Sequence, residues 1–518
     1  MNTQFTNAAF PLDHLAIGKD PQAPALVTRS GALTYEMLNH RVGILARWLM
    51  DQGLAKGERV ATWLPKTELA CIMPLATVRA GLVHVPINPV LKPAQVRHII
   101  ADSGAKLMIA NAGRIKPVTE STQDKPFGQD CEIRDEAGVS AIIEQMGNPL
   151  EPSALTPDTE ALAAILYTSG STGRPKGVML SNDNLGLGAI SVAQYLKLEP
   201  DDRTLCVLPL SFDYGQNQLL STWYAGGCAY PLDYLMPRDV IKACAHNQIT
   251  TLAAVPPLWV QLVDQDWSQE AIESMRRLTN SGGALTPSLV GQLRGIFGSK
   301  TDIYAMYGLT EAFRSTYLDP ALIDDNPTSM GKAIPFAEIM VVRADGEVAE
   351  IGEEGELVHA GPLVAKGYWQ DAKRTAERFK PAPAASQYGG IAVWSGDTVR
   401  REQDGLLYFV GRTDNMIKSS GNRISPTEVE EVAVESGFVA EAVAVGVPDE
   451  RLGHAICLYV RPVKSQENGT VEQKLGKYLK RNLPNFMHPR DIIVLNEFPK
   501  NPNGKLDRNA LVKKQKYE

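Results

Sequence analysis

The segment 167–178, YTSGSTGRPKGV, concentrates groups that bind phosphate. Its residues include three glycines, four Ser or Thr hydroxyls and two cations, and they follow an apolar stretch that predicts a strand. Glycine lets backbone N–H groups approach a phosphate closely, hydroxyls donate further hydrogen bonds, and lysine supplies a point charge. The pattern is not a Walker A loop, because Pro175 stands where that loop needs Gly and Gly177 where it needs Ser or Thr. A flexible surface loop is the alternative, but such a density of groups directly after a strand favours a phosphate-binding loop.

Four further segments carry residues suited to nucleotide chemistry. They are YGLTE at 307–311, WSGD at 394–397, GRTDNMIK at 411–418 with GNRI at 421–424, and PKNPNGK at 499–505. Together with TSGSTGRPKG they resemble, in order and spacing, the motifs of the AMP-forming adenylating enzymes. That family includes acyl-CoA synthetases, luciferases and the adenylation domains of peptide synthetases. One such motif is a weak signal, whereas five in order over nearly the whole chain make chance agreement negligible.

The resemblance implies an ATP site. Thr310 would lie near the α-phosphate, and Glu311 would hold Mg²⁺, a hard cation that prefers carboxylate and phosphate oxygens. An ordinary glutamate at the start of a surface helix is the alternative for Glu311. Asp397 would accept hydrogen bonds from both ribose hydroxyls with support from Arg412, although an isolated Asp after Gly is more often a turn residue. The implied nucleotide site comprises Thr168, Ser169, Gly170, Ser171, Thr172, Gly173 and Lys176 around the phosphates, Gly282, Gly283 and Ala284 along the adenine, and Tyr307, Asp397, Arg412 and Lys418.

The resemblance also makes Lys505 the catalytic residue, together with Thr310 and Glu311. Attack of a carboxylate on the α-phosphorus brings two anions together, so a cation at the bridging oxygens stabilises the transition state by several kcal/mol. Without its motif, a lysine near a C-terminus would be a solvated charge. Asp414 matches the hinge about which the family rotates its C-terminal domain before thioester formation. Gly421 would then let a pantetheine arm of CoA or of a carrier protein pass close to the backbone.

The segment LSFDYG at 210–215 is typical of the acid-binding pocket of peptide-synthetase adenylation domains, in which the matching Asp holds the substrate's α-ammonium group. Motif offsets assign the pocket to Asp213, Tyr214, Asn217, Thr279, Ser281, Met306, Arg314 and Ser315. A lining with both signs of charge is costly around a long alkyl chain. A purely structural pair between Asp213 and Arg314 is the alternative.

Two segments, SFDYGQNQLL and YGLTEAFRSTYL, resemble a narrower branch of stand-alone ligases. This branch contains exosortase-associated acyl-CoA ligases and prolyl carrier-protein ligases, and the chain ends without the region of a fused carrier. Three functions stay open: a thioester-forming ligase for CoA or a carrier protein, including a stand-alone aminoacyl carrier-protein ligase; a luciferase-type mono-oxygenase; and a non-catalytic nucleotide-binding relative. The polar pocket disfavours the second, and intact Lys505, Glu311 and Asp397 disfavour the third.

Strands and helices, which must position these residues, are expected to alternate along the chain. Between about 59 and 112 the strands VATWL, VHVPI and KLMIA alternate with helices expected at 67–80 and 93–101, which predicts βαβ units with a parallel sheet. A polar stretch at 123–160 is expected to be a connector poor in structure. The strands LAAIL, RTLCVLP and TTLAAV, with helices from Asn182 and Gln216, predict a second such sheet. A shift to period two at 331–362 predicts a small β-rich unit.

The expected fold is therefore α/β, with a large N-terminal domain of two doubly wound sheets plus the small β-rich unit. A small mobile α+β C-terminal domain would follow. The boundary is expected at 413–414, so that 1–413 binds ATP and the acid and 414–518 carries Lys505.

Composition excludes several other classes of protein. The 518 residues carry 52 Lys and Arg against 59 Asp and Glu, and the net charge of −7 disfavours a dedicated nucleic-acid binder. The first residues, MNTQFTNAAFPLDHL, do not show the basic and then apolar pattern of a signal peptide, and no apolar run approaches about 20 residues. We therefore expect a cytoplasmic protein without a membrane span. The six scattered cysteines predict buried free thiols. Expected partners are a small carboxylic or amino acid and, as one option, an acyl carrier protein, with the chain acting as a monomer or homodimer.

Overall fold

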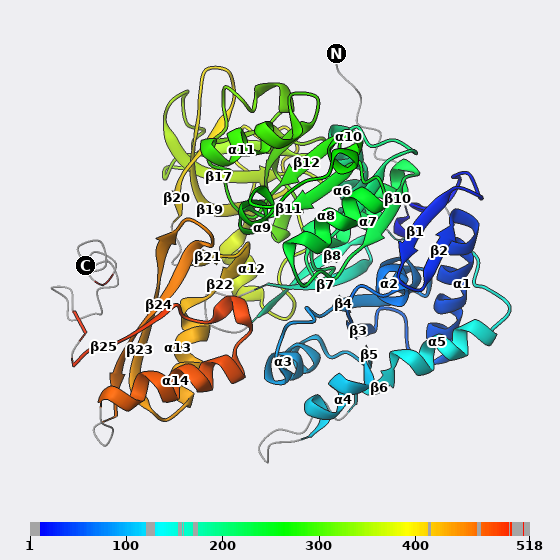
Figure 1. Cartoon of the computed structure of the whole chain (residues 1–518), viewed down its shortest axis with the longest axis horizontal. Coiled ribbons are helices and arrows are strands. Elements are labelled where there is room, and N and C mark those ends of the chain that lie inside the picture. Colours follow the sequence, from blue (N-terminus) through cyan, green and yellow to red (C-terminus); the bar gives the residue numbers. More distant parts are fainter. Residues whose placement is uncertain are drawn as a thin grey trace.

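The computed structural model describes residues 11–120, 130–153, 158, 160–168, 175–412, 416–463, 468–496, 498, 499 and 511. Over these residues the strands form three sheets, and helices pack against them in a mixed α/β arrangement (Figure 1). All six cysteines are free thiols, and five of them are buried, as predicted. Every helix within the described ranges is too short or too polar to span a bilayer.

The first sheet has the strand order β6-β5-β3-β4-β7-β8 and confirms the predicted βαβ units. Its strands run parallel except β8, which is antiparallel to β7. The sequences of β4 and β5 are mostly apolar because both strands are buried along their whole length. Its elements are β3 (Arg59–Trp63), α2 (Glu68–Arg79), β4 (Val83–Pro86), α3 (Pro93–Ser103), β5 (Leu107–Ala110), α4 (Ala112–Thr119), β6 (Glu132–Asp135), α5 (Glu136–Gln145), β7 (Leu162–Thr168) and β8 (Lys176–Ser181).

The prediction of a structure-poor connector at 123–160 is wrong for part of that stretch. Strand β6 adds to the edge of the first sheet beside β5, and α5 follows it directly. Asp135 caps α5 by accepting a hydrogen bond from the backbone of Gly138. The short strand has half-exposed polar residues typical of a sheet edge, so its pattern lacks the apolar run of a central strand.

The second sheet is a 14-stranded sheet whose central part is parallel, as predicted. Helix α7 begins at Asp213, three residues before the predicted start, because Gly215 lets its first turn pack tightly on Pro209. The parallel part and its N-terminal hairpin consist of β1 (Pro24–Thr28), β2 (Gly31–Thr34), β9 (Arg203–Cys206), β10 (Cys228–Pro231), β11 (Thr251–Ala254), β12 (Arg277–Asn280) and β13 (Asp302–Tyr307). The helices in this part of the chain are η1 (Leu12–His14), α1 (Tyr35–Asp51), α6 (Asn182–Tyr195), α7 (Asp213–Ala225), α8 (Pro237–His246), α9 (Pro256–Val263), α10 (Gln269–Ser274) and α11 (Pro287–Phe297).

The predicted β-rich unit is present, but it continues the second sheet instead of standing apart. Strand β14 pairs with β13, and the antiparallel strands extend the sheet from there. Tyr307 on β13 and Asp397 on β19 therefore belong to one sheet. The elements are η2 (Thr310–Ala312), β14 (Thr316–Tyr317), η3 (Pro320–Leu322), β15 (Ser329–Ala333), β16 (Glu338–Val342), β17 (Glu354–Ala360), α12 (Ala372–Arg378), β18 (Phe379–Pro381), β19 (Ile391–Arg401) and β20 (Leu407–Arg412).

The C-terminal unit, residues 416–499 where described, has its own sheet of order β22-β21-β24-β23, with β25 beside β24. Its core joins Val429 of α13 and Leu475 of α14 to Leu458 of β24. Its elements are β21 (Ile417–Ser419), β22 (Asn422–Ile424), α13 (Pro426–Glu435), β23 (Val439–Asp449), β24 (Gly453–Pro462), α14 (Asn468–Asn482), η4 (Asn485–Met487) and β25 (Asp491–Val494). The predicted boundary at 413–414 falls outside the described residues and stays a prediction.

Candidate active site

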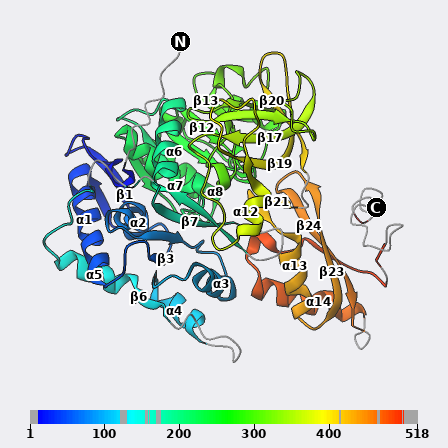
Figure 2. The same ribbon diagram turned by 180° about the vertical axis from the view of Figure 1, so that it is seen from behind.

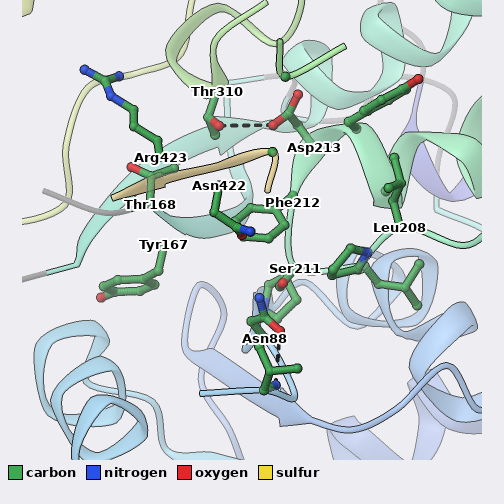
Figure 3. Close-up of a pocket in the computed structure, with 18 of the residues that line it drawn as sticks. Asn88, Tyr167, Thr168, Leu208, Ser211, Phe212, Asp213, Thr310, Asn422 and Arg423 are labelled. Atoms are coloured by element: carbon green, nitrogen blue, oxygen red, sulfur yellow. Dashed lines mark hydrogen bonds between the residues drawn. The ribbon is translucent and has the colours of Figure 1, made fainter. Parts of the chain in front are cut away.

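A cavity of about 540 Å³ is lined by residues of both large sheets and of the C-terminal unit. Thr168 ends β7, and the loop 207–212 follows β9. Because the carboxyl ends of parallel strands commonly form the ligand site of an open α/β sheet, this is where a substrate is expected. Figure 3 shows Thr168, Phe212, Asp213 and Thr310 around this pocket, together with Asn422 and Arg423 of β22.

Lys176, Glu311 and Tyr368 form a buried polar cluster beside this cavity. Lys176 Nζ donates to Glu311 Oε1 at 3.1 Å and to the Tyr368 hydroxyl at 2.6 Å, and that hydroxyl donates to Glu311 Oε1 at 2.7 Å. Burial acts to raise the pKa of Glu311, but Lys176, Arg378 and Arg423 outweigh it and hold this pKa well below its ordinary value. Glu311 is therefore an ionised carboxylate surrounded by cations, which is the state that a cation-binding residue requires.

The pairing of β7 with β8 explains why Lys176 lies here. In the antiparallel register Thr168 lies opposite Lys176, so the two ends of the predicted phosphate loop are held together. The buried Thr168 hydroxyl has no hydrogen-bond partner among the described residues. The loop residues Ser169, Gly170, Ser171, Thr172 and Gly173 lie outside the described part of the chain.

The predicted ribose site is a buried pair of residues on the second sheet. The Tyr307 hydroxyl donates to Asp397 Oδ2, and both residues line the cavity. Arg412 lies opposite Asp397 in the pairing of β19 with β20, although its side chain is outside the described set. Gly282 and Lys418 also line the cavity, whereas Gly283 and Ala284 follow Gly282 without being part of the lining.

Asp213 is the first residue of α7 and lines the main cavity together with Thr310. Thr310 Oγ1 donates to Asp213 Oδ1 at 3.0 Å, drawn as a dashed line in Figure 3. Arg314 Nη2 lies 3.9 Å from Asp213 Oδ2, and its guanidinium stacks 4.5 Å from the centre of the Tyr214 ring. Burial raises the pKa of Asp213 against the opposing effects of Arg314 and Thr310. The carboxylate is thus incompletely stabilised by the groups around it.

A second cavity of about 20 Å³ gathers other predicted pocket residues. The Tyr214 hydroxyl hydrogen-bonds to the carbonyl oxygen of Thr279 at 2.8 Å, which ties α7 to β12. Buried Arg314 Nε and Asn217 Oδ1 have no hydrogen-bond partner within the described residues. The predicted pocket residues that line this second cavity are Tyr214, Asn217, Thr279, Met306 and Arg314.

The other two predicted pocket residues lie in different places. Ser281 lines the main cavity. Ser315 is fully buried and hydrogen-bonds to His359 Nδ1 at 3.0 Å, and it lines neither cavity. Burial lowers the pKa of His359 to about 3, so this pair is neutral and structural in character. The spacing from the motif therefore predicts that Ser315 lines the pocket, whereas the structure places it in the protein core.

Gly421 brings the C-terminal unit to the cavity. Its backbone has a φ of +75°, and a Cβ at this position would lie 2.9 Å from the side chain of Val255. Only glycine combines that backbone conformation with so close an approach. Lys505 and Asp414, the predicted catalytic lysine and hinge, lie outside the described residues.

Sequence reasoning missed several residues of the site. Tyr368 completes the Lys176–Glu311 cluster from the segment after β17, which carries none of the five motifs. Arg423 belongs to the GNRI motif, so the motif indicated that this residue is near the site. That its charge lowers the pKa of Glu311 from the C-terminal unit is seen only in the tertiary structure.

Comparison with known proteins agrees with this arrangement. A family model described as AMP-binding enzyme matches residues 14–369, and one described as AMP-binding enzyme C-terminal domain matches residues 428–505. Gramicidin S synthase 2 of Brevibacillus brevis is 30% identical over 506 residues, which cover 97% of this chain and 11% of that protein. The chain thus spans about a tenth of the length of that curated relative.

Two solved structures share the fold over nearly their whole length. A double mutant of o-succinylbenzoate-CoA synthetase from Bacillus subtilis, bound with the product analogue OSB-NCoA, has a TM-score of 0.83 at 25% identity and covers 97% of this chain and 98% of its own. ATP-bound MatB from Rhodopseudomonas palustris has a TM-score of 0.69 at 26% identity and covers 98% of this chain and 99% of its own. They confirm the predicted α/β class with a large N-terminal and a smaller C-terminal part. Since the family model covers most of a chain in which residues of four motifs meet around one cavity, the protein belongs to the AMP-binding enzymes, the adenylating family that its motifs predicted.

Proposed function

We propose that this protein is an ATP-dependent carboxylic acid ligase that forms an acyl-adenylate and pyrophosphate, and then a thioester. The observation that carries the proposal is the main cavity, in which the buried Glu311 cluster, the Asp397–Tyr307 pair and the Asp213–Arg314 pair open onto one space. These three groups suit a polyphosphate, a ribose and a polar acid respectively. The chemistry fits the membership of the family.

The residues around Glu311 suit Mg²⁺ together with ATP phosphates. An ionised, buried carboxylate is a hard oxygen ligand, and Lys176 and the Thr168 hydroxyl offer a charge and a donor to the phosphates. Within the described ranges no group of three or more His, Cys, Asp or Glu side chains could hold a metal. A Mg²⁺ ion at Glu311 would also bind phosphate oxygens and water, which is usual for Mg²⁺ at a nucleotide site. Lys505 is proposed to neutralise the charge at the bridging oxygens during adenylation.

The thiol acceptor is proposed to be CoA or a carrier-protein phosphopantetheine that enters past Gly421. Gly421 lines the cavity and presents its backbone there without a side chain. The position of Gly421 against Val255, in the wall of the cavity, supports a placement of the C-terminal unit for the thioester step, with 414–518 as the moving domain.

A second candidate is narrower: a ligase for an amine-bearing acid such as an amino acid. Arg314 approaches Asp213 Oδ2 only to 3.9 Å, which is too long for a hydrogen bond, and burial dominates the pKa of Asp213. A substrate ammonium group at Oδ2 would supply the missing charge. The polar surroundings of Arg314 also disfavour a luciferase-type substrate, because a bulky apolar ring system would leave these groups unpaired.

The test is an ATP–pyrophosphate exchange screen over amino acids, short acids and aryl acids. Exchange that depends on one acid, followed by thioester formation when CoA or a phosphopantetheinylated carrier is added, is expected. Asp397→Ala should lose exchange, whereas Asp371→Ala, an aspartate at the cap of α12, serves as the matched control. Lack of exchange with every acid would refute the ligase assignment. The cytoplasmic location and the monomeric or dimeric state stay predictions.

A further inference from the structure

One hydrogen bond joins the C-terminal unit to the helical layer of the first sheet. Gln95 Nε2 on α3 donates to Glu428 Oε1 on α13 at 2.7 Å, across a sequence separation of 333 residues. Both views show α3 next to the C-terminal unit (Figure 1, Figure 2). Glu428 is 5% exposed and Gln95 is half-buried, so the contact is partly shielded from water.

The amide of Gln95 is held in place by its own helix. Gln95 Oε1 accepts a hydrogen bond from the backbone N–H of Lys92 at the start of α3, at 3.1 Å. This leaves Nε2 to face Glu428, whose second oxygen has no hydrogen-bond partner among the described residues. The donor is therefore oriented before the two units meet, which lowers the entropic cost of the contact.

The contact also forms part of the cavity wall. Gln95 and Glu428 both line the main cavity, and Phe486 and Met487 of η4 line it from the same unit. Glu428 lies seven residues after Gly421, on the helix that follows β22. The position of α13 against α3 and the position of Gly421 against Val255 are thus set by one short, connected segment.

We propose that Gln95 and Glu428 are positioning residues that dock the C-terminal unit in the arrangement used for thioester formation. This inference rests on the proposed function, in which the C-terminal unit changes place between adenylation and thioester formation. A contact between residues so far apart in sequence breaks when the unit leaves. It consequently stabilises one arrangement and contributes nothing to the other.

The test measures the two half-reactions separately in the full chain. Gln95→Glu keeps the acceptor for Lys92 but removes the donor, and Glu428→Ala removes the acceptor. Each should slow thioester formation by about 10-fold, the order expected for a partly buried hydrogen bond to a carboxyl group, and leave ATP–pyrophosphate exchange within about twofold of wild type. The double variant should be no slower than the slower single variant.

Two matched variants separate docking from general stability. Glu428→Gln keeps an acceptor oxygen and should restore the thioester rate, and Glu435→Ala removes an exposed glutamate at the far end of the same helix and should change neither half-reaction. Equal losses in both half-reactions with a lowered Tm would mean a structural role and would overturn the proposal. An unchanged thioester rate in Gln95→Glu would overturn it as well.

Small-angle X-ray scattering measures whether the C-terminal unit is docked, and this measurement does not depend on enzymatic activity. Gln95→Glu should increase the radius of gyration relative to wild type, because the released unit samples other positions. If the wild type forms no adenylate in the acid screen, the proposed function fails, and the scattering comparison still decides whether the contact docks the unit. An identical scattering curve for the two proteins would refute the docking role.

Discussion

The ammonium group of Lys176 lies 3.1 Å from Glu311 Oε1, although the two residues are 135 positions apart. Both side chains are nearly buried, with 13% and 3% of their surfaces exposed. Breaking a buried ion pair by removing one partner costs about 3–5 kcal/mol because a charge is left uncompensated. The same ion pair therefore holds Lys176 at the proposed phosphate site and stabilises the fold.

Lys176→Met should destabilise the protein by about 3–5 kcal/mol and abolish ATP–pyrophosphate exchange. The matched control is Lys366→Met, since Lys366 pairs with Glu160 at a more exposed position, where such a pair contributes about 0–1 kcal/mol. Denaturant unfolding at neutral pH measures both changes. Equal, small effects of the two substitutions would contradict the role given to the buried pair.

Lys505→Ala should abolish adenylate formation and largely spare thioester formation from a supplied acyl-adenylate. The reason is that the lysine is needed only while charge builds up at the bridging oxygens. Single-turnover assays of each half-reaction measure this, with Lys513→Ala as a control in the same region. Loss of both half-reactions to the same extent would refute the separation of roles.

Asp414→Pro should preserve pyrophosphate exchange and block thioester formation. Proline fixes φ near −65°, so a hinge at this position could no longer turn. The measurement is the ratio of exchange to overall thioester turnover in the variant and in wild type. Unimpaired overall turnover would place the hinge elsewhere.

Asp213→Ala should lower kcat/KM for an amine-bearing acid by roughly 30- to 3,000-fold, since an unpaired ammonium in a desolvated pocket costs about 2–5 kcal/mol. The des-amino analogue of the same acid should be affected far less. Matched pairs of acids, assayed on wild type and on the variant, give the comparison. A wild-type preference for the des-amino acids would leave a general acyl ligase as the better description.

Docking of α13 should weaken as the pH rises through about 7. Burial raises the pKa of Glu428 from 4.5 to about 7, with Glu431 adding to the rise and the hydrogen bond from Gln95 opposing it. The docked state holds a proton that the undocked carboxyl releases at lower pH, so docking is favoured below the ordinary pKa and loses this advantage through about 7. Scattering between pH 5 and 8 measures it, and Glu428→Gln should remove the dependence on pH.

The parts of the molecule that the sequence predicted are those with local signals. The buried strands β4 and β5 are continuous apolar runs. Thr310, Glu311 and Asp397 line one cavity, and their roles in binding ATP stay predictions. Edge strand β6 has no such run, because none of its four residues is fully buried and three of them are charged, so the sequence predicts a connector there.

Contacts between distant segments were beyond sequence reasoning. Tyr368 meets Glu311 only because its segment forms a bridge to Val178 of β8, and Gln95 meets Glu428 only because two units dock. Neither pair has a spacing or composition that marks it. Ser315 shows a different limit. Its distance from the YGLTE motif suggested a pocket residue, but the sequence does not tell whether a side chain faces the cavity or, as here, faces His359.

The hydroxyl group of Thr310 donates its hydrogen bond to Asp213, although the proposed α-phosphate site would use the same donor. A threonine hydroxyl can donate only once. When an α-phosphate oxygen takes this donor, Asp213 loses a partner and its attraction for a substrate ammonium group grows. Under the proposed roles, binding of the nucleotide therefore raises the affinity for the amine-bearing acid, and binding of the acid raises the affinity for the nucleotide by the same factor.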